Sequence, residues 1–286
     1  MLGAVGDLLE DVVVRLHETV NHASDTQATV LRRRGGSAAN VVEAAVRAGA
    51  PARFIGQVGG DGVGQWLTDQ LTALGAEVVV RREGRSGTII VLLDVNGERT
   101  MLSDRATATE LSPPDPAWLD GLHTLHVPFY SLEIEPLAST SMTLAAMATQ
   151  RGLTVSIDMS SAAVLERYGV PRALSVIRFL RPTVVLANEL EAQVLGASFR
   201  PEQLGGAMVI VKQGAEPAIV HRAGEPSVEV PAVLVPGVTD TTGAGDAFAA
   251  GVLIALARGD DAITAVHNGH VVAAAAVRRA SLLPEG

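Results

Sequence analysis

The chain has 286 residues, of which 48% are hydrophobic and 19% charged, and it carries a net charge of −9. These values exclude intrinsic disorder and argue against a nucleic-acid partner, because nucleic-acid binding needs a basic surface. The chain contains no cysteine, which excludes disulfides and thiolate chemistry and fits a cytoplasmic protein. Residues 1–10 lack the pattern of a signal peptide, and no long uncharged apolar run predicts a membrane partner.

The N-terminal third of the chain alternates between strand and helix patterns. Short β-branched runs predict strands, whereas apolar residues at helical spacing predict helices. In chain order we expect a strand at 4–16, a strand at 26–34, a helix at 38–48, a strand at 53–58, a helix at 63–74 and two strands at 87–94 and 99–103. The last two strands flank Asn96-Gly97, a dipeptide typical of a tight hairpin turn.

The rest of the chain alternates more regularly. Strand patterns occur at 124–127, 154–157, 183–186 and 208–211, and helical patterns at 137–150, 189–195, 244–257 and 262–279. This alternation predicts a three-layer α/β/α domain with a central, mainly parallel sheet. The strand at 26–34 and the hairpin around Asn96-Gly97 do not fit this alternation. We therefore expect one domain over 1–286 that carries a small β lid, drawn from about 11–35 and 86–105.

One glycine-rich segment precedes the predicted helix at 244–257. It reads Asp240-Thr241-Thr242-Gly243-Ala244-Gly245-Asp246. Glycines allow close backbone approach, and the free N–H groups of Gly243, Ala244 and Gly245 at a helix N-terminus suit a phosphate or a developing anion. Asp246 lies beside them, where a carboxylate can accept the proton of an attacking hydroxyl. The alternative is an ordinary helix start with an acidic cap.

A second glycine pair precedes the helix at 38–48. Gly35 and Gly36 again allow close approach, and Asn40 offers one acceptor and two donors to a polyol. Taken alone, this segment fits a plain helix start with Asn40 facing solvent equally well.

Together the two segments resemble the signatures of the ribokinase-like (PfkB) carbohydrate kinase family. The first signature matches at Gly36, Asn40, Gly49 and Gly59, and the second matches over 240–246 without a break. The first departs at Val42, where the family usually has a small residue. The resemblance implies ATP-dependent phosphorylation of a primary hydroxyl on a small sugar, in the manner of ribokinase or fructokinase.

The resemblance also implies roles for individual residues. Asp246 becomes the general base, and Gly243, Ala244 and Gly245 form the anion hole. Asn188-Glu191 matches the family's Asn-x-x-Glu motif, which organises Mg²⁺ largely through water. For these acidic positions the alternative is a solvated first helical turn.

For the substrate and the nucleotide, the resemblance implies two further sets. The sugar would contact Asp11, Gly35, Gly36, Asn40, Glu133 and Asp246, with Leu9 standing where ribokinase has a polar residue. ATP would contact Asn188, Lys212, Gly214, Gly245 and Asn268. Many members of the family also use a monovalent cation such as K⁺, and Asp240 and Thr242 match half of that site.

Three alternatives stay open at this level. A nucleoside kinase has the same scaffold, and Phe129 or Tyr130 would then stack on the base. A binding protein that has lost turnover is a second alternative, and a homodimer through exposed lid strands is a third hypothesis. A dinucleotide-dependent enzyme is disfavoured because no Gly-x-Gly-x-x-Gly follows the first strand.

Overall fold

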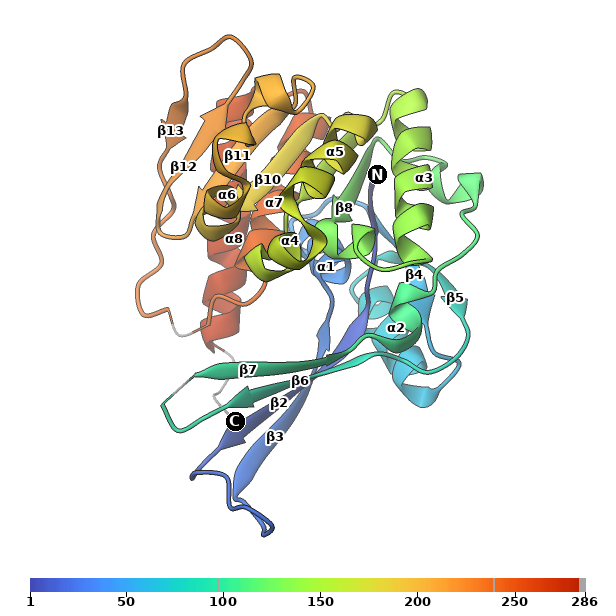
Figure 1. The fold of residues 1–286 in the computed structure, drawn as a ribbon, viewed down its shortest axis with the longest axis vertical. Helices are drawn as coiled ribbons and strands as arrows, with labels where there is room; N and C mark the ends of the chain where they lie inside the picture. The colour runs from blue at the N-terminus through green and yellow to red at the C-terminus, as the bar shows by residue number, and fades with distance from the viewer. Residues whose placement is uncertain (97, 239, 283–286) are drawn as a thin grey trace.

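The computed structural model describes residues 1–96, 98–238 and 240–282, and its strands form two sheets (Figure 1). The expected turn at Asn96-Gly97 therefore lies partly outside the described residues. The larger sheet has nine strands in the order β13 (Val228–Val230), β12 (Glu216–His221), β11 (Met208–Gln213), β10 (Val184–Asn188), β9 (Thr154–Asp158), β8 (Thr124–Pro128), β1 (Leu2–Val5), β4 (Ala52–Val58) and β5 (Glu77–Arg82).

The nine-stranded sheet is parallel from β11 through β5, and β12 and β13 add two antiparallel strands at one edge. Its central strands are short and apolar on both sides, which suits a sheet covered by helices on each face. Parallel strands place all their carboxyl ends along one edge, and that edge faces the second sheet.

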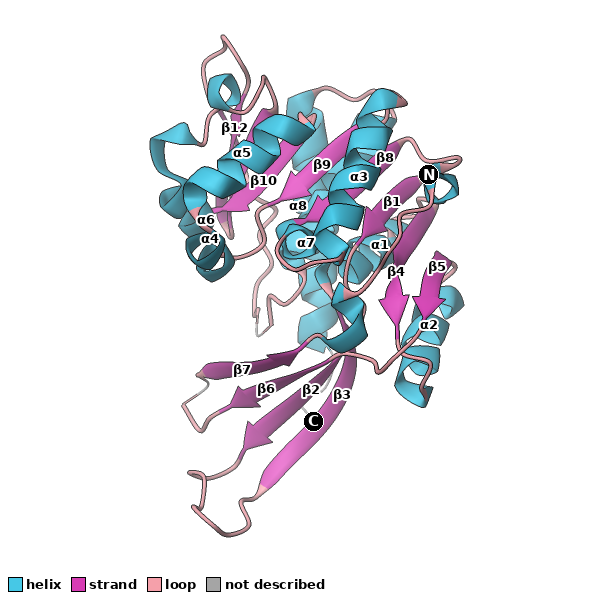
Figure 2. Cartoon of the chain, turned by 45° about the vertical axis from the view of Figure 1, so that its right-hand side comes forward, coloured by secondary structure: helices cyan, strands magenta, loops and turns pink. Residues whose placement is uncertain are grey.

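Helices cover both faces of the large sheet (Figure 2). One face carries α1 (Ser37–Arg47), α2 (Gly62–Ala73), α7 (Ala244–Ala257) and α8 (Ala262–Leu282), and the other carries α3 (Leu137–Gln150), α4 (Ala162–Tyr168), α5 (Val170–Leu180) and α6 (Glu189–Leu195). Short 3-10 helices occur at Ala106–Thr109, Pro116–Leu119, Phe129–Leu132, Gly196–Ser198 and Pro201–Gln203. The three-layer α/β/α fold expected from the sequence is confirmed. Within the described ranges, no helix combines the length and apolar character needed to cross a membrane.

The second sheet has four strands and projects from one end of the body (Figure 1). Its order is β3 (Ala28–Gly35), β2 (Leu9–Leu16), β6 (Thr88–Leu93) and β7 (Arg99–Asp104), and we call these four strands the lid. The middle pair, β2 and β6, is parallel, whereas both outer pairs are antiparallel.

The strand expected at 4–16 is two strands that belong to different sheets. β1 stays in the body, where Gly6 still donates its N–H to the Ile55 carbonyl, and β2 begins at Leu9 in the lid. The chain bends at Gly6, where a Cβ atom would lie 2.4 Å from the Ser131 hydroxyl. Sequence alternation alone does not reveal this break, because the connecting residues Asp7 and Leu8 are themselves buried.

Candidate active site

A cavity of about 1270 Å³ lies between the lid, the carboxyl ends of the parallel strands and the start of α7. Leu9 and Ile89 line it from the lid, and Asp158 and Asn188 line it from the ends of β9 and β10. Open α/β sheets bind ligands at this edge, because every strand delivers its last side chain there. The cavity is large enough for two small molecules side by side.

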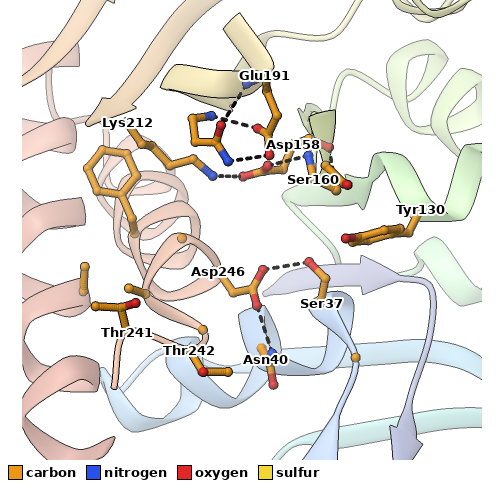
Figure 3. Close-up of a pocket in the computed structure, with 18 of the residues that line it drawn as sticks. Ser37, Asn40, Tyr130, Asp158, Ser160, Glu191, Lys212, Thr241, Thr242 and Asp246 are labelled. Carbon is orange, nitrogen blue, oxygen red and sulfur yellow. Dashed lines mark hydrogen bonds and ion pairs between the residues drawn. The ribbon is translucent and has the colours of Figure 1, made fainter. Parts of the chain in front are cut away.

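Asp246 lies in the first turn of α7 and is held from two sides (Figure 3). The Ser37 hydroxyl donates to Oδ1 at 2.7 Å, and the Asn40 amide donates to Oδ2 at 2.9 Å. Burial raises the pKa of Asp246 to about 6, although these two hydrogen bonds oppose the rise. The result is a fixed carboxylate that is ionised at neutral pH and still basic enough to take a proton.

The orientation of Asn40 is itself fixed by a neighbour. Arg34, at the end of β3, donates to Asn40 Oδ1 at 3.0 Å and also pairs with Glu43. Because the amide oxygen accepts from the arginine, the amide nitrogen points at Asp246. The solvent-facing alternative for Asn40 is thereby replaced by a part-buried chain of contacts from Glu43 to Asp246.

The glycine loop before α7 supplies fewer free N–H groups than the sequence suggests. The helix begins at Ala244, and Gly243 precedes it with a φ of 75°, the left-handed conformation that glycine tolerates best. The N–H of Ala244 donates to the Thr241 carbonyl at 3.1 Å, which removes it from the expected anion hole. Gly245 follows, and a Cβ there would lie 3.3 Å from Lys212 Nζ, so this glycine makes room for the lysine.

Lys212 forms an ion pair with Asp158 across the strand ends, with Nζ and Oδ2 2.5 Å apart. Burial alone would lower the pKa of Lys212, but the carboxylates of Asp158 and Glu191 raise it. The lysine therefore stays charged beside Gly245 and Asp246 (Figure 3), where a fixed cation can stabilise a bound anion.

Asn188 and Glu191 bind each other as a reciprocal cap at the start of α6. Asn188 donates its N–H to Glu191 Oε2 at 2.8 Å, and the Glu191 N–H donates to Asn188 Oδ1 at 2.9 Å. Glu191 is only 2% exposed, so it is not the solvated helix-start residue of the alternative interpretation. Burial, followed by the nearby charge of Asp158, raises the pKa of Glu191 to about 7.

These residues fit a magnesium ion held through water. Glu191, Asp158 and Asp246 are three acidic groups close to the Lys212 cation, so among the described residues in this part of the cavity the acidic groups outnumber it. Among the described residues, no three acidic or histidine side chains are close enough to ligate a metal directly. Mg²⁺ retains much of its water shell and binds with phosphate oxygens, so it does not need such a cage.

The lid side of the cavity is lined by polar and charged groups. Asp11 lines it, and burial together with the charge of Asp7 raises the pKa of Asp11 to about 6. Asp7 pairs with Arg105, whose guanidinium lies 4.5 Å from the centre of the Tyr130 ring. Glu133 lines the cavity where it was expected, and Arg167 donates to it at 2.8 Å.

Gly35 and Gly36 make room for acidic side chains and backbone rather than for a ligand alone. A Cβ on Gly35 would lie 2.4 Å from the Asp11 carboxylate, and one on Gly36 would lie 2.2 Å from the Asp7 carbonyl oxygen. Gly36 lines the cavity, whereas Gly35 is not among the described residues that do. The pair therefore brings Asp7 and Asp11 close to the start of α1.

On the nucleotide side, Lys212 and Gly214 line the cavity as expected but Asn268 does not. The Asn268 amide instead donates to the Gly251 carbonyl at 2.7 Å, where α8 packs on α7. The described part of α8 contributes other residues to the cavity wall, namely His270, Ala273, Ala274 and Val277. Asn268 faces the helix pair because it lies on a different side of α8.

Asp240 and Thr242 contact arginines from the lid. Arg33 Nη1 lies 3.4 Å and Arg99 Nη2 lies 3.6 Å from the two carboxylate oxygens of Asp240. Burial would raise the pKa of Asp240, but the hydrogen bonds from Thr242 and the two arginine charges lower it.

Sequence reasoning missed several residues that the structure brings into the site. These are Ser37, Asp158, Arg105 and Arg167. Asp158 carried a signal that was available, since an acidic residue directly after a buried strand lies at the ligand-binding edge. The arginines gave no such signal, because Arg105 and Arg167 meet Asp7 and Glu133 only through the tertiary fold.

Comparison with known proteins gives a consistent result. The model of the pfkB family carbohydrate kinases matches residues 2–283. A fructokinase from Klebsiella pneumoniae is 31% identical over 248 residues, which cover 82% of this chain and 80% of that protein. In structure, an adenosine kinase from Sinorhizobium meliloti superposes with a TM-score of 0.82 at 21% identity over 98% of both chains. A putative ribokinase II from E. coli superposes with a TM-score of 0.80 at 22% identity, and the match covers 96% of this chain and 92% of that one.

Proposed function

Because this chain belongs to the pfkB family of carbohydrate kinases and is an ATP-dependent sugar kinase, we propose that it phosphorylates a primary hydroxyl of a small sugar, with Asp246 as the general base. The observation that carries the proposal is the placement of Asp246, held by Ser37 and Asn40 beside the charged Lys212. The whole chain, 1–286, acts in this proposal as one kinase domain whose lid covers the substrate.

In the proposed reaction the substrate hydroxyl attacks the γ-phosphorus of ATP, Asp246 takes the proton of that hydroxyl, and ADP leaves. Lys212 and the N-terminal end of α7 stabilise negative charge where the phosphoryl group passes, since fixed donors and cations are most effective where charge develops. Asn188 and Glu191 would hold Mg²⁺ through its waters, and the ion would neutralise phosphate charge. The lid excludes water, which would otherwise compete as the acceptor.

We group the lining residues into a polar half and an apolar half for the two substrates, although the apolar Ile89 pairs with Asp11 and also lines the cavity. The polar half contains Asp7, Asp11 and Glu133, whose carboxylates suit the hydroxyl groups of a sugar. The apolar half is lined by Val233, Leu234, Val235, Val238, Ala273 and Val277 and suits the flat face of a purine.

The polar half favours a sugar over a nucleoside as acceptor. Phe129, expected as a stacking partner for a base, is 0% exposed and packs edge-on against Tyr168. Tyr130 lines the cavity, but the Arg105 guanidinium lies over its ring. A fructose- or ribose-like acceptor is therefore our first candidate, and a nucleoside is the runner-up.

Two further features complete the proposal. We place the protein in the cytoplasm, where ATP is available.

We also propose a homodimer through the lid, because Val30 and Leu102 are 57% and 51% exposed, far more than large apolar side chains of a covered sheet face. Sedimentation at micromolar concentration tests the dimer, and a clean monomer would contradict it.

The decisive experiment is ATP consumption with Mg²⁺ over a panel of sugars and nucleosides, for the wild type and for Asp246→Asn. We expect turnover with one sugar and a loss of about a hundredfold or more in the variant, as expected for removal of a general base. Turnover with nucleosides alone would support the runner-up. If no compound reacts while both proteins bind ATP equally, either the panel lacks the substrate or the chain is a non-catalytic relative, and thermal-shift binding on the same panel separates the two.

A further inference from the structure

Two lid arginines meet at the loop that leads into α7. Arg33 comes from β3 and Arg99 from β7, which are the two outer strands of the lid. Both guanidinium groups reach Asp240, the first residue of the glycine loop that carries Asp246. The two edges of the lid thus converge on one carboxylate of the catalytic loop.

The contacts at Asp240 use both of its carboxylate oxygens. Oδ2 faces Arg33, while Oδ1 faces Arg99 and also accepts the N–H of Thr242 at 2.8 Å. The Thr242 hydroxyl lies 3.4 Å from Arg99 Nη1. The Asp240 side chain is only 19% exposed, so these contacts are partly shielded from water.

This arrangement does not fit the monovalent cation that the family resemblance implies at Asp240 and Thr242. A K⁺ ion binds oxygen atoms, and here both carboxylate oxygens and the hydroxyl already face guanidinium groups. An arginine keeps its charge at any physiological pH, so a second cation at the same oxygens would be repelled. The local charge on Asp240 is therefore balanced by the chain itself.

We propose that Arg33 and Arg99 supply at Asp240 the positive charge that a monovalent cation would otherwise supply, so that this chain needs no K⁺. The inference rests on the proposed kinase function. Arg33 and Arg99 act here as positioning residues, since they touch Asp240 and not the reacting groups. These two contacts therefore connect the lid to the loop that precedes Asp246.

The first measurement needs no turnover. We compare thermal midpoints in KCl and in tetramethylammonium chloride at equal ionic strength, for the wild type and for Arg33→Gln/Arg99→Gln. The wild type should give equal midpoints within about 1 °C, because an ion that does not bind does not stabilise. The double variant should show a rise of about 2–4 °C specific to K⁺, because its Asp240 is then open. A K⁺-specific rise in the wild type would overturn the proposal.

The second measurement uses the sugar found in the substrate panel. The wild type should show the same kcat in both salts, and the double variant should lose about tenfold or more in kcat, with part of that loss restored by K⁺. Activation of the wild type by K⁺ of tenfold or more, a double variant with unchanged kcat, or a loss that K⁺ fails to restore would each overturn the proposal.

Arg32→Gln is the matched control, since Arg32 lies on the same strand but is 69% exposed and pairs with Glu10 instead. It should keep the wild-type response to both salts, and a response like that of the double variant would show a general effect of lid charge and overturn the assignment. If no sugar reacts with any protein, the proposed function fails, and the thermal midpoints still decide the cation question.

Discussion

The body and the lid are both β-sheets, yet they are stabilised in different ways. The nine-stranded sheet lies between two helix layers, and large apolar clusters fill both of its faces. The lid has no helix layer, and its described core contains Leu9, Ile89 and Ala108 with Val91 beside them (Figure 2). The chemistry therefore rests on a rigid support, whereas the part that covers the substrate has little burial of its own to hold it in place.

The largest contrast should appear in the ion pairs of the two regions. Lys212→Met leaves Asp158 buried without its partner, so we expect a loss of about 3 kcal/mol in the free energy of unfolding. Arg85→Met removes an exposed pair with Asp104 beside the lid and should cost less than about 1 kcal/mol. Urea denaturation measures both, and equal losses would contradict the difference between body and lid.

The next effect concerns the ionisation of Asp246, a buried carboxyl of the body. Its folded pKa of about 6 lies above the ordinary value of 3.8, so the folded state loses stability as pH rises from about 4 to 6. Asp246→Asn removes this cost, and its stability relative to the wild type should improve by about 2–3 kcal/mol between pH 4 and pH 7. Thermal denaturation over this range gives the difference. A constant difference would show that the carboxyl has an ordinary pKa.

In the proposed mechanism the same group sets the acid limb of activity. A general base at Asp246 must be ionised, so kcat/KM of the wild type should fall about tenfold per unit below pH 6. A pH profile on the substrate found above measures the limb, and a flat profile down to pH 4.5 would remove Asp246 from the role of base.

A smaller effect should follow from loosening the contact between lid and body at Asn40. Arg34→Met frees the Asn40 amide to turn its oxygen toward Asp246, so kcat should fall about tenfold and the acid limb should move to higher pH. Arg47→Met is the control, because Arg47 pairs with Glu43 at 2.7 Å through Nε. If both variants behave alike, the effect belongs to Glu43 and not to Asn40.

The last prediction concerns hydrogen exchange of backbone amides in the wild-type protein and needs no mutation. Backbone amides of β2 and β6 should exchange with deuterium at least about tenfold faster than those of β1 and β8, since the lid has few buried contacts. Bound sugar should slow the lid amides and leave the body unchanged. Equal exchange in the two sheets would contradict the lid's low local stability.

The sequence was informative where chemistry is local. The sequence singled out the run from Asp240 to Asp246 and the segment around Asn40 as two glycine-rich helix starts, and the structure joins them through the Asn40–Asp246 hydrogen bond. The central strands and six of the helices beside them also followed from periodicity, whereas α4 and α5 were not predicted. Local pattern was sufficient for the fold class.

The rest depended on how distant segments meet. Asp158 and Lys212 belong to strands separated in the sheet by β10. The spacing of residues along the chain does not predict their ion pair. The antiparallel edge strands β12 and β13 and the strand β5 were also not predicted, since each is short and partly exposed. Asn268 faced α7 because its side of α8 was decided by packing.

The parallel pair at the centre of the lid bears on how the chain folds. Asp11 in β2 pairs with Ile89 in β6, and β4, α2 and β5 lie between these two strands in the chain. β2 therefore cannot pair with β6 until those elements have been synthesised. Until then the β2–β3 hairpin presents valines and leucines on both faces, with an open edge that can recruit another strand. Pairing over such a sequence distance is slow. The open edge of β2 is thus available for pairing with another chain during the interval of synthesis between β3 and β6.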